Sequence, residues 1–466
     1  MEEKKDAAVR YAEYAHDLTF DQLPDATVAC TKADIFDSLS TGLAGSSAVG
    51  IKEVMELAED WGGKQEATTF VFGKKLLAQD AAMVNAAMIH GYDYDDTHEV
   101  AMMHCGCIAV STALAAAEYM GGVSGKDLIT AVTIALDIQC RLGISSTIGI
   151  VESGYIYTPL LGIFAGTLGA GKIMGLTKEQ MINALGIAYS HSAGNYQVIT
   201  DSAWTKRLQP GFAARNAIIA CEMAKKGVVG PYNVFEGKYG FYNVYLNGRV
   251  NRDMLCEGLG KVFTGDDLAF KPWPCGRPSQ PPINAAIEVF EKYHPDPAQI
   301  EKIEIEMNEH LIVAGFLPAE ERQHPKVMEQ AQFSIPYGVA CGIANGHFGL
   351  TDYTREALVR PDIQELSGKV FCVVNEEIEK EYHARTCPVI MHVYMKDGSV
   401  IDHRLDLTLG CKEKPMTEKA VMDKAEDCAA TAAVKLPEGT PAKLKEMVDH
   451  LEELENTNDL MKIMLA

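Results

Sequence analysis

The apolar helical sequence in the first half of the chain is the feature that most restricts the fold. Residues 107–120 are so rich in Ala, Val and Leu that a helix there is apolar on most of its surface, and residues 128–142 and 157–174 continue the pattern. A helix that is apolar all round belongs in the middle of a bundle. We therefore expect a helical region from Asp6 to about Arg249.

Apolar residues at three- and four-residue spacing, broken by Gly, Pro and Asp-rich turns, support this expectation. Residues 34–43 and 78–89 are further predicted buried helices. The glycines within residues 162–171 would let helix backbones approach closely, and they lack the spacing of a phosphate-binding loop. A nucleotide site is therefore not predicted there.

The character of the sequence changes after about residue 265. Strands are predicted at residues 302–307, 369–374, 389–395 and 399–405, the last two joined as a hairpin by a turn that contains glycine. Helices are predicted at residues 285–293 and 328–345. Helices with many charged residues are predicted again at residues 417–433 and 441–454, and these helices could pack with the first domain.

A chain of 466 residues is too long for one ordinary compact core. We predict a mainly α protein with a helical domain (residues 1–265), a smaller α+β domain (266–409) and C-terminal helices (410–466). Clefts between domains are favoured ligand sites, so we expect a cleft between the two domains to bind the ligand.

Composition and charge argue against several classes of function. The formal net charge is -22, whereas nucleic acids and anionic membranes are bound by basic patches. The twelve cysteines show no repeated pair spacing of a disulfide framework or a zinc site. The sequence also shows neither a signal peptide nor a run of eighteen apolar residues. We expect a cytoplasmic protein that binds a small molecule, with no nucleic acid or membrane partner.

Residues 91–107 gather several ionisable side chains into one short window. If the segment is helical, Asp93, Thr97 and His104 fall on one stripe, within roughly 40° of each other. A carboxylate, a hydroxyl and an imidazole would then face one cavity. The alternative is that the acids cap the helix that follows, since Asp and Thr are preferred at helix starts. Capping would explain Asp96 and Thr97 but not His104.

Two pairs of cations are candidates for binding a carboxylate. Lys206 and Arg207 precede a Pro-Gly turn, and their alternative is a solvated surface position, as is common for Lys and Arg. Lys271 and Arg277 lie in a segment stiffened by prolines, for which a simple linker is the alternative. Linkers are usually polar and flexible, and a Trp between two prolines is neither, so we favour a functional role.

Several weaker candidates lie at predicted helix ends. Tyr155, Tyr157 and His191 could offer protons to the same cavity, although packing or capping is the more common role of such residues. The residues around His191 do not form a nucleophile elbow, so a hydrolase triad is not supported. Cys105 and Cys107 make only a weak metal motif, with one residue between the thiols.

Five motifs together resemble one family. They are residues 93–97 (Asp-Tyr-Asp-Asp-Thr) with His104, 204–208 (Trp-Thr-Lys-Arg-Leu), 235–241 (Phe-Glu-Gly-Lys-Tyr-Gly-Phe), 271–277 (Lys-Pro-Trp-Pro-Cys-Gly-Arg) and 329–337 (Glu-Gln-Ala-Gln-Phe-Ser-Ile-Pro-Tyr). In this order they resemble the MmgE/PrpD family of dehydratases, decarboxylases and epimerases. The resemblance implies an all-helical first domain joined by the C-terminal helices, a smaller α+β lid and a homodimer. It also implies lyase or isomerase chemistry on small di- or tricarboxylates, without a metal or another cofactor.

Carried over position by position, five residues match positions that line the active site in the family: Asp93, Thr97, His104, Lys206 and Lys271. The chain departs from the family at three positions where many members have histidine, and these are Ile156, Gln209 and Gln280. Glutamine can form hydrogen bonds but cannot shuttle a proton, and isoleucine can do neither. Proton transfer would therefore fall mainly to His104 and Lys271.

We predict that His104 is the general base or acid, oriented by Asp93, and that Lys271 is the second proton-transfer group or the cation that stabilises an enolate-like intermediate. Lys206 and Arg277 would bind substrate carboxylates, with Arg suited to a bidentate contact. The other predicted substrate-binding residues are Thr97, Tyr157 and Gln280.

Three alternatives remain open from the sequence. The first is an epimerase of a small dicarboxylate such as iminodisuccinate, because elimination, decarboxylation and inversion share a carbanionic step. The second is a non-catalytic homologue that binds a carboxylate. The third is a metalloenzyme built on Asp93, Asp95 and Asp96, which lie too close in sequence to surround one ion without other ligands.

Overall fold

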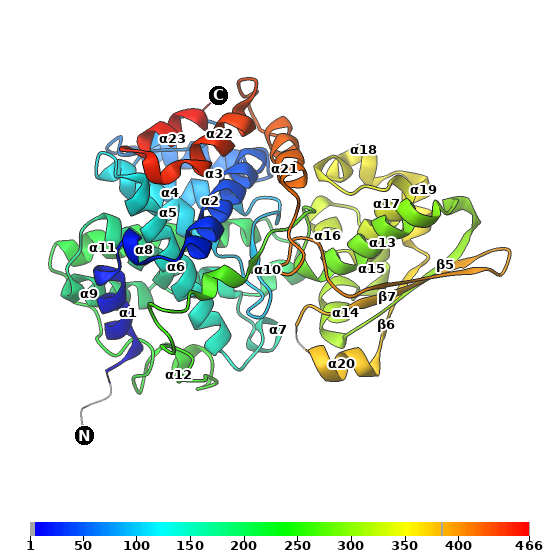
Figure 1. Ribbon diagram of the computed structural model, residues 1–466, viewed down its shortest axis with the longest axis horizontal. Coiled ribbons are helices and arrows are strands. Elements are labelled where there is room, and N and C mark those ends of the chain that lie inside the picture. The colour runs from blue at the N-terminus through cyan, green and yellow to red at the C-terminus, as the bar shows by residue number, and fades with distance from the viewer. Residues whose placement is uncertain (1–4, 384, 466) are drawn as a thin grey trace. The chain divides into compact units, whose positions relative to one another are not determined.

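The computed structural model describes residues 5–383 and 385–465, which divide into two compact units (Figure 1). Unit 1 consists of Met1–Gly91, Asp95–Leu268 and Met422–Ala466. Unit 2 consists of Tyr92–Tyr94 and Ala269–Val421. The three residues Tyr92–Tyr94 therefore belong to unit 2, although their neighbours along the chain belong to unit 1.

Unit 1 is helical, as predicted. Its helices are α1 (Ala7–Asp17), α2 (Asp25–Gly45), α3 (Ile51–Trp61), α4 (Ala78–Ile89), α5 (Gly106–Tyr119), α6 (Gly125–Ser145), α7 (Ile150–Ser153), α8 (Tyr157–Ile173), α9 (Lys178–Tyr189), α10 (Gln197–Thr200), α11 (Thr205–Lys225), α12 (Phe241–Tyr245), α22 (Thr440–Asp449) and α23 (Asn458–Ile463). Helix α21 (Glu418–Ala430) leads the chain back into this unit. The short strands β1 (Ala67–Thr68) and β2 (Lys75–Leu76) pair antiparallel, β3 is Thr97–His98, and β4 (Leu268–Ala269) lies where the unit ends.

The core of unit 1 is built on the apolar helices. Helix α8 packs against α5, α6, α9 and α11 and is buried along almost its whole length. Glycines make this packing possible: a Cβ on Gly162 would lie 2.3 Å from Ile108, and a Cβ on Gly169 would lie 2.9 Å from the carbonyl oxygen of Ala131. Helix α6 is long and apolar enough to cross a membrane, but its apolar segment is buried within this core.

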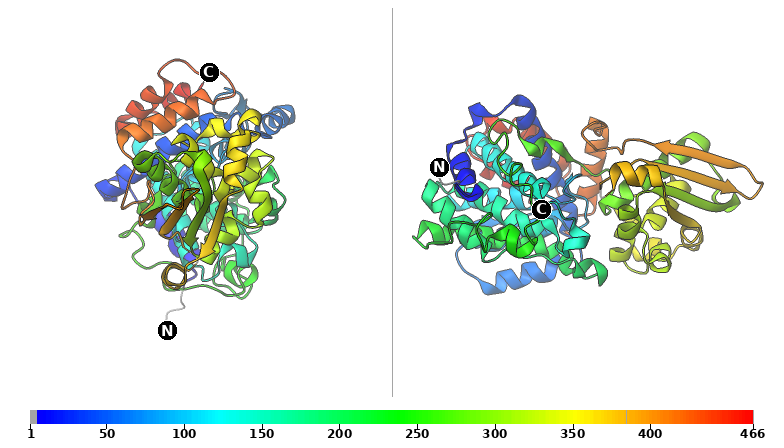
Figure 2. Two further views of the ribbon diagram at one scale, coloured as in Figure 1. Left: turned by 90° about the vertical axis from the view of Figure 1, so that its right-hand side faces the viewer. Right: turned by 90° about the horizontal axis from the view of Figure 1, so that it is seen from below.

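Unit 2 contains a four-stranded sheet with the order β6-β5-β7-β8 (Figure 2, left). The strands are β5 (Ile300–Met307), β6 (Val370–Val374), β7 (Val389–Met395) and β8 (Val400–Leu405). Strand β5 runs parallel to β6 and antiparallel to β7. Strands β7 and β8 form the predicted hairpin, in which Val393 pairs with Ile401.

Unit 2 also contains helices, some of which pack against this sheet. They are α13 (Gln280–Tyr293), α14 (Glu309–Gly315), α15 (Ala319–Gln323), α16 (Met328–Gln332), α17 (Ile335–Asn345), α18 (Arg355–Leu358), α19 (Pro361–Ser367) and α20 (Glu376–Tyr382). Helix α13 packs against β7, β8 and α17. Short 3-10 turns of the two units lie at Phe20–Gln22, Thr264–Asp267, Arg277–Ser279, Pro297–Gln299, Leu350–Tyr353 and Leu451–Glu453.

One predicted helix of unit 2 is broken. The sequence predicts a single helix over residues 328–345, but α16 ends at Gln332 and α17 begins at Ile335. The side chain of Ser334 accepts a hydrogen bond from the backbone N–H of Tyr337, 3.0 Å away, and so caps α17. Pro336 in the first turn of α17 favours a helix start at this point.

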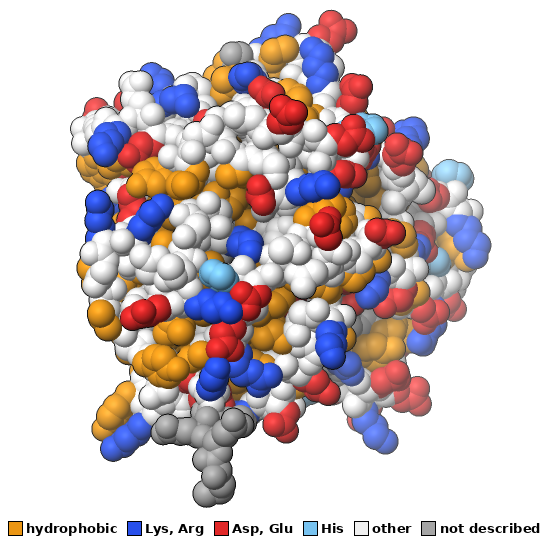
Figure 3. Space-filling view, turned by 60° about the vertical axis from the view of Figure 1, so that its left-hand side comes forward, with side chains coloured by type: hydrophobic (Ala, Val, Ile, Leu, Met, Phe, Trp, Pro, Cys, Tyr) orange, Lys and Arg blue, Asp and Glu red, His pale blue; other side chains and the backbone are white. Residues whose placement is uncertain are grey.

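The surface carries mixed charges. Lys and Arg side chains are interspersed with Asp, Glu and hydrophobic side chains over the face shown in Figure 3. The acidic excess of the whole chain, -22, is therefore not gathered into a single block on this face.

Candidate active site

The segment between α4 and α5 is not helical. Helix α4 ends at Ile89 and α5 begins at Gly106, and the intervening residues form turns and the two-residue strand β3. Asp93 and Met102 have positive φ angles of 56° and 52°, which a right-handed helix does not allow. The helical stripe that was predicted to align three side chains of this segment is therefore wrong.

Asp96 has the capping role that was the alternative reading of this segment. Its Oδ2 accepts a hydrogen bond from the backbone N–H of Cys105 at 2.9 Å, and its Oδ1 accepts one from Gly106 at 3.0 Å. These bonds satisfy donors at the start of α5. Burial, reinforced by the neighbouring Asp95, raises the pKa of Asp96 to about 7. Thr97 is buried in β3.

His104 is held in one tautomer by its backbone surroundings. Its Nδ1 lies 2.7 Å from the carbonyl oxygen of Asp96, and a carbonyl oxygen only accepts, so Nδ1 carries the proton and donates. In the neutral ring the lone pair then lies on the other ring nitrogen, Nε2. The backbone N–H of His104 donates to Thr158 Oγ1 at 2.9 Å, and Gln139 Nε2 donates to the His104 carbonyl at 2.8 Å. The side chain is 13% exposed, so the imidazole is fixed yet accessible.

A second histidine, His90, lies beside His104. The two ring centroids are 4.6 Å apart in an edge-to-face arrangement. His90 Nδ1 lies 2.9 Å from Asp95 Oδ2, and His90 Nε2 lies 2.7 Å from Lys206 Nζ. Asp95 Oδ1 is also 3.3 Å from His104 Nδ1. The structure therefore links His104 and Lys206 through His90, which was not predicted, and Asp95, which was named only as a possible metal ligand.

Burial sets the charges of this group. It lowers the pKa of His90 to about 4, in spite of the opposing effect of Asp95. Burial alone would raise the pKa of Asp95, but His104 and His90 outweigh it and hold that pKa well below its usual range. The carboxylate of Asp95 is therefore ionised and the imidazole of His90 is neutral near pH 7.

His90 was not predicted from the sequence because the conspicuous window begins one residue later, at Gly91. The signal that could have found it is a histidine at the end of an apolar helix, directly followed by that acidic window. His98, which does belong to the window, has a different role. It is buried, and its Nδ1 accepts a hydrogen bond from the backbone N–H of Ala101 at 3.2 Å.

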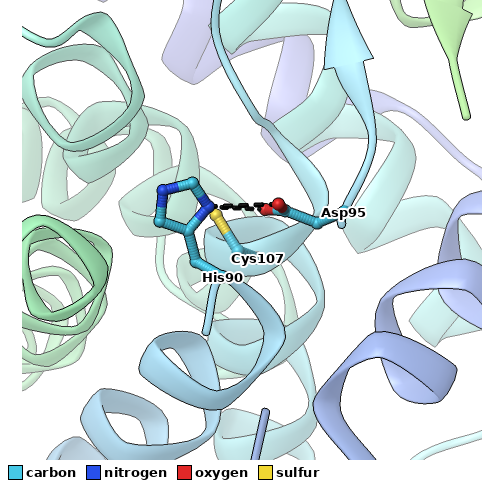
Figure 4. A group of neighbouring side chains, drawn as sticks. All are labelled: His90, Asp95 and Cys107. Carbon is cyan, nitrogen blue, oxygen red and sulfur yellow. Dashed lines mark hydrogen bonds and ion pairs between the residues drawn. The ribbon is translucent and has the colours of Figure 1, made fainter. Parts of the chain in front are cut away.

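One group of possible metal ligands in unit 1 consists of His90, Asp95 and Cys107, whose ligand atoms lie within 4.8 Å of one another (Figure 4). Both ring nitrogens of His90 already have hydrogen-bond partners, and one of these is the cationic Lys206. Burial also raises the pKa of the Cys107 thiol well above its usual value, whereas a metal binds the thiolate. These contacts fit a hydrogen-bond chain better than a metal site.

Asp93 and Lys271 form a buried pair within unit 2. Lys271 Nζ donates to the Asp93 carbonyl oxygen at 2.7 Å and to its carboxylate oxygen Oδ1. The side chain of Lys271 is fully buried. Within unit 1 the carboxylate of Asp95 lies beside His104 Nδ1, and the role of Asp93 in orienting His104 stays a prediction. Within unit 2 Asp93 forms an ion pair with Lys271.

The proline-containing segment after Lys271 is braced by Gln280. The Gln280 side chain is fully buried, and its Nε2 donates to the carbonyl oxygens of Trp273 at 2.8 Å and Cys275 at 3.2 Å. Arg277 is buried in the same segment, and burial lowers its pKa to about 10. Gln280 therefore stabilises the loop that carries the two predicted cations.

Tyr157 has a packing role. Its hydroxyl lies 2.5 Å from the carbonyl oxygen of Ile148, to which it donates, and 2.8 Å from Ser146 Oγ. Ile156 is buried at the N-cap of α8. Arg207 is buried as well and donates to the carbonyl oxygen of Val49 at 3.0 Å.

A cavity of about 300 Å³ lies elsewhere in unit 1. It is lined by His191, Ala193, Gly194, Asn195, Thr205, Gln209, Phe212, Ala213 and Asn216. Gln209 Nε2 donates to the carbonyl oxygen of Asn195 at 3.2 Å. The lining contains no Lys or Arg, so the cavity does not offer a cation to a carboxylate.

The sequence matches one protein family along most of its length. The MmgE/PrpD N-terminal domain matches residues 9–253, and the MmgE/PrpD C-terminal domain matches residues 273–452. Cis-aconitate decarboxylase from Aspergillus terreus is 25% identical, over 97% of this chain and 94% of its own length. The human enzyme of the same name is 25% identical, over 97% and 93%. The 2-methylcitrate dehydratase from Escherichia coli is 26% identical, over 65% and 64%.

Proposed function

Because the chain belongs to the MmgE/PrpD family, we propose that it is a lyase that acts on a small di- or tricarboxylate by moving a proton at a carbon next to a carboxylate. A dehydratase removes such a proton before the hydroxyl group leaves. A decarboxylase delivers a proton to the carbon that has lost CO₂. The decarboxylases and the dehydratase that resemble this chain support both forms of the reaction.

The observation that carries the proposal is the tautomer of His104. Its Nδ1–H is bonded to the Asp96 carbonyl, so in the neutral ring the lone pair lies on Nε2, the atom that a general base uses. The partly exposed ring keeps access to a substrate, and Asp95 lies close enough to Nδ1 to stabilise the imidazolium that forms when the ring takes up a proton.

The cations have complementary roles in the proposal. The proton transfer creates an electron-rich, enolate-like intermediate, which nearby positive charge stabilises. Lys206 is proposed to bind a carboxylate of the substrate, and its contact with His90 holds the ammonium group in place. Lys271 is proposed as a second proton-transfer group or as the cation for the oxyanion, and Arg277 and Thr97 as further substrate ligands.

The proposal also includes a homodimer, a cytoplasmic location and a reaction without a metal. Both ring nitrogens of His90 already have hydrogen-bond partners, which favours a reaction without a metal. A chelator should therefore leave the turnover rate unchanged. A dimer would have a mass about twice that of the 50.8 kDa chain, as measured by light scattering.

The test is turnover of cis-aconitate and 2-methylcitrate in D₂O, followed by NMR. Loss of CO₂ or loss of water supports the proposal. Inversion without loss of a group would indicate the epimerase alternative, and binding without any exchange would indicate a non-catalytic homologue.

His104→Ala should lower the turnover rate by about 10²- to 10⁴-fold, the usual contribution of a general acid or base. His450→Ala is the control, because His450 is exposed and contacts the exposed Glu453. A His104→Ala enzyme as active as this control would contradict the assignment.

A further inference from the structure

His90 occupies a position that joins two of the proposed functional groups. It lies at the C-cap of α4 and is 1% exposed. Its ring stands between the carboxylate of Asp95 and the ammonium group of Lys206, which come from the segment before β3 and from the first turn of α11. Both neighbours are polar, so the burial of this imidazole is accompanied by a hydrogen bond at each nitrogen.

The chemistry of these neighbours fixes the direction of both bonds. A lysine ammonium group has donors and no acceptor, so Lys206 Nζ donates to His90 Nε2. An ionised carboxylate only accepts, so His90 Nδ1–H donates to Asp95. The ring is therefore neutral, with its proton on Nδ1, in the same tautomer as His104.

Asp95 extends this chain to the proposed base. Its Oδ2 accepts from His90, and its Oδ1 lies 3.3 Å from His104 Nδ1. A single buried carboxylate thus contacts two imidazoles. Rigid neighbours of this kind keep a functional group within the narrow range of positions that efficient catalysis requires.

We propose that His90 is a positioning residue, which holds the ammonium group of Lys206 at a fixed place and orients the Asp95 carboxylate toward His104. The inference rests on the proposed function for its consequence in catalysis. His90 itself transfers no proton in this scheme. A purely structural histidine would instead matter only for packing.

Two substitutions separate these possibilities. In His90→Gln the amide oxygen can accept from Lys206 while the amide nitrogen donates to Asp95. In His90→Leu neither bond can form. We expect His90→Leu to lower kcat about 10- to 100-fold, as the loss of supporting hydrogen bonds commonly does, and His90→Gln to recover most of that loss with the pH profile of the wild type.

The control is His98→Gln, at a second buried histidine whose ring contacts the backbone of Ala101. It should lower the melting temperature and leave kcat per folded molecule unchanged. Equal kcat for His90→Leu and wild type would overturn the proposal. Equal loss in His90→Gln and His90→Leu would also overturn it, because the ring would then be needed for more than its two hydrogen bonds.

A spectroscopic measurement tests the inference independently of turnover. NMR of ¹⁵N-labelled histidine should show His90 protonated at Nδ1 and unprotonated at Nε2 near pH 7, and Lys206→Met should shift the Nε2 resonance. A proton on Nε2 would overturn the inference. If the wild type turns over none of the substrates while these resonances agree, the proposed function fails and the assigned position of His90 stands.

Discussion

Asp34 is a buried carboxyl group on α2 whose two oxygens have no hydrogen-bond partner among the described residues. The backbone of α5 packs closely over it, so that a Cβ on Gly106 would lie 2.8 Å from both oxygens. Burial raises the pKa of Asp34 well above its usual value, and the nearby carboxyl groups of Asp96 and Asp37 raise it further. The folded protein therefore holds the proton of Asp34 to a higher pH than the unfolded chain does.

The first prediction concerns Asp34→Asn, which replaces the protonated carboxyl group by a neutral group of the same shape. Above about pH 4 the unfolded chain releases this proton and the folded chain keeps it, so the free energy of unfolding of the wild type falls as pH rises. The free energy of unfolding of the variant does not fall in this way. Urea unfolding at about pH 5 and about pH 8 should show that the free energy of unfolding of the variant, relative to that of the wild type, increases by up to about 1.4 kcal/mol per pH unit. A difference independent of pH would contradict the prediction.

The second prediction concerns the pair of Lys271 and Asp93 in unit 2. Lys271→Met removes the cation beside a buried carboxylate and should destabilise the protein by about 3–5 kcal/mol. Adding Asp93→Asn should recover most of this stability, because asparagine is neutral and tolerates the positive φ of this position.

Thermal unfolding measures the stability part of this prediction, and turnover measures the rest. The double variant should be stable but inactive if Lys271 acts in the reaction. A stable double variant that retained wild-type turnover would show that the pair serves only the fold.

At the scale of elements, the start of α5 depends on a distant cap. Asp96 is nine residues before Cys105 in the sequence, yet its carboxylate accepts from the first backbone donors of the helix. Asp96→Ala should lower the free energy of unfolding by about 1–2 kcal/mol, the usual cost of losing an N-cap. Asp96→Asn should lower the free energy of unfolding by less, because the amide oxygen of asparagine still accepts one hydrogen bond. Urea unfolding of the two variants decides this, and equal stability of Asp96→Ala and wild type would refute the capping role.

Elements with a strong apolar pattern were predicted well from the sequence. Residues 78–89 coincide with α4, and residues 389–395 coincide with β7. The path of residues 91–105 was not predicted from the sequence. It depends on positive φ angles at Asp93 and Met102, and side-chain periodicity carries no signal for such angles. The same limit explains why Asp95 was not predicted to lie beside His104, whereas the role of Asp93 in orienting His104 stays a prediction.

At the scale of the whole molecule, long-range packing decides which residues belong together. Tyr92–Tyr94 belongs to unit 2, and there Lys271, more than 170 positions later, pairs with Asp93. The order of the motifs was enough to recognise the family. It did not reveal His90, whose importance depends on the folded positions of Asp95 and Lys206.

The last prediction uses the cysteines to test both units at once. Cys30 is partly exposed, whereas the other eleven of the twelve cysteines are buried. Burial also raises the pKa of buried thiols, to about 11 for Cys256 in unit 1 and for Cys387 in unit 2, so the reactive thiolate is scarce there. A thiol reagent should therefore label one cysteine in the native protein and all twelve after unfolding in denaturant. Cys30→Ser should remove the native labelling, and rapid labelling of several cysteines in native protein would contradict the packing described for the two cores.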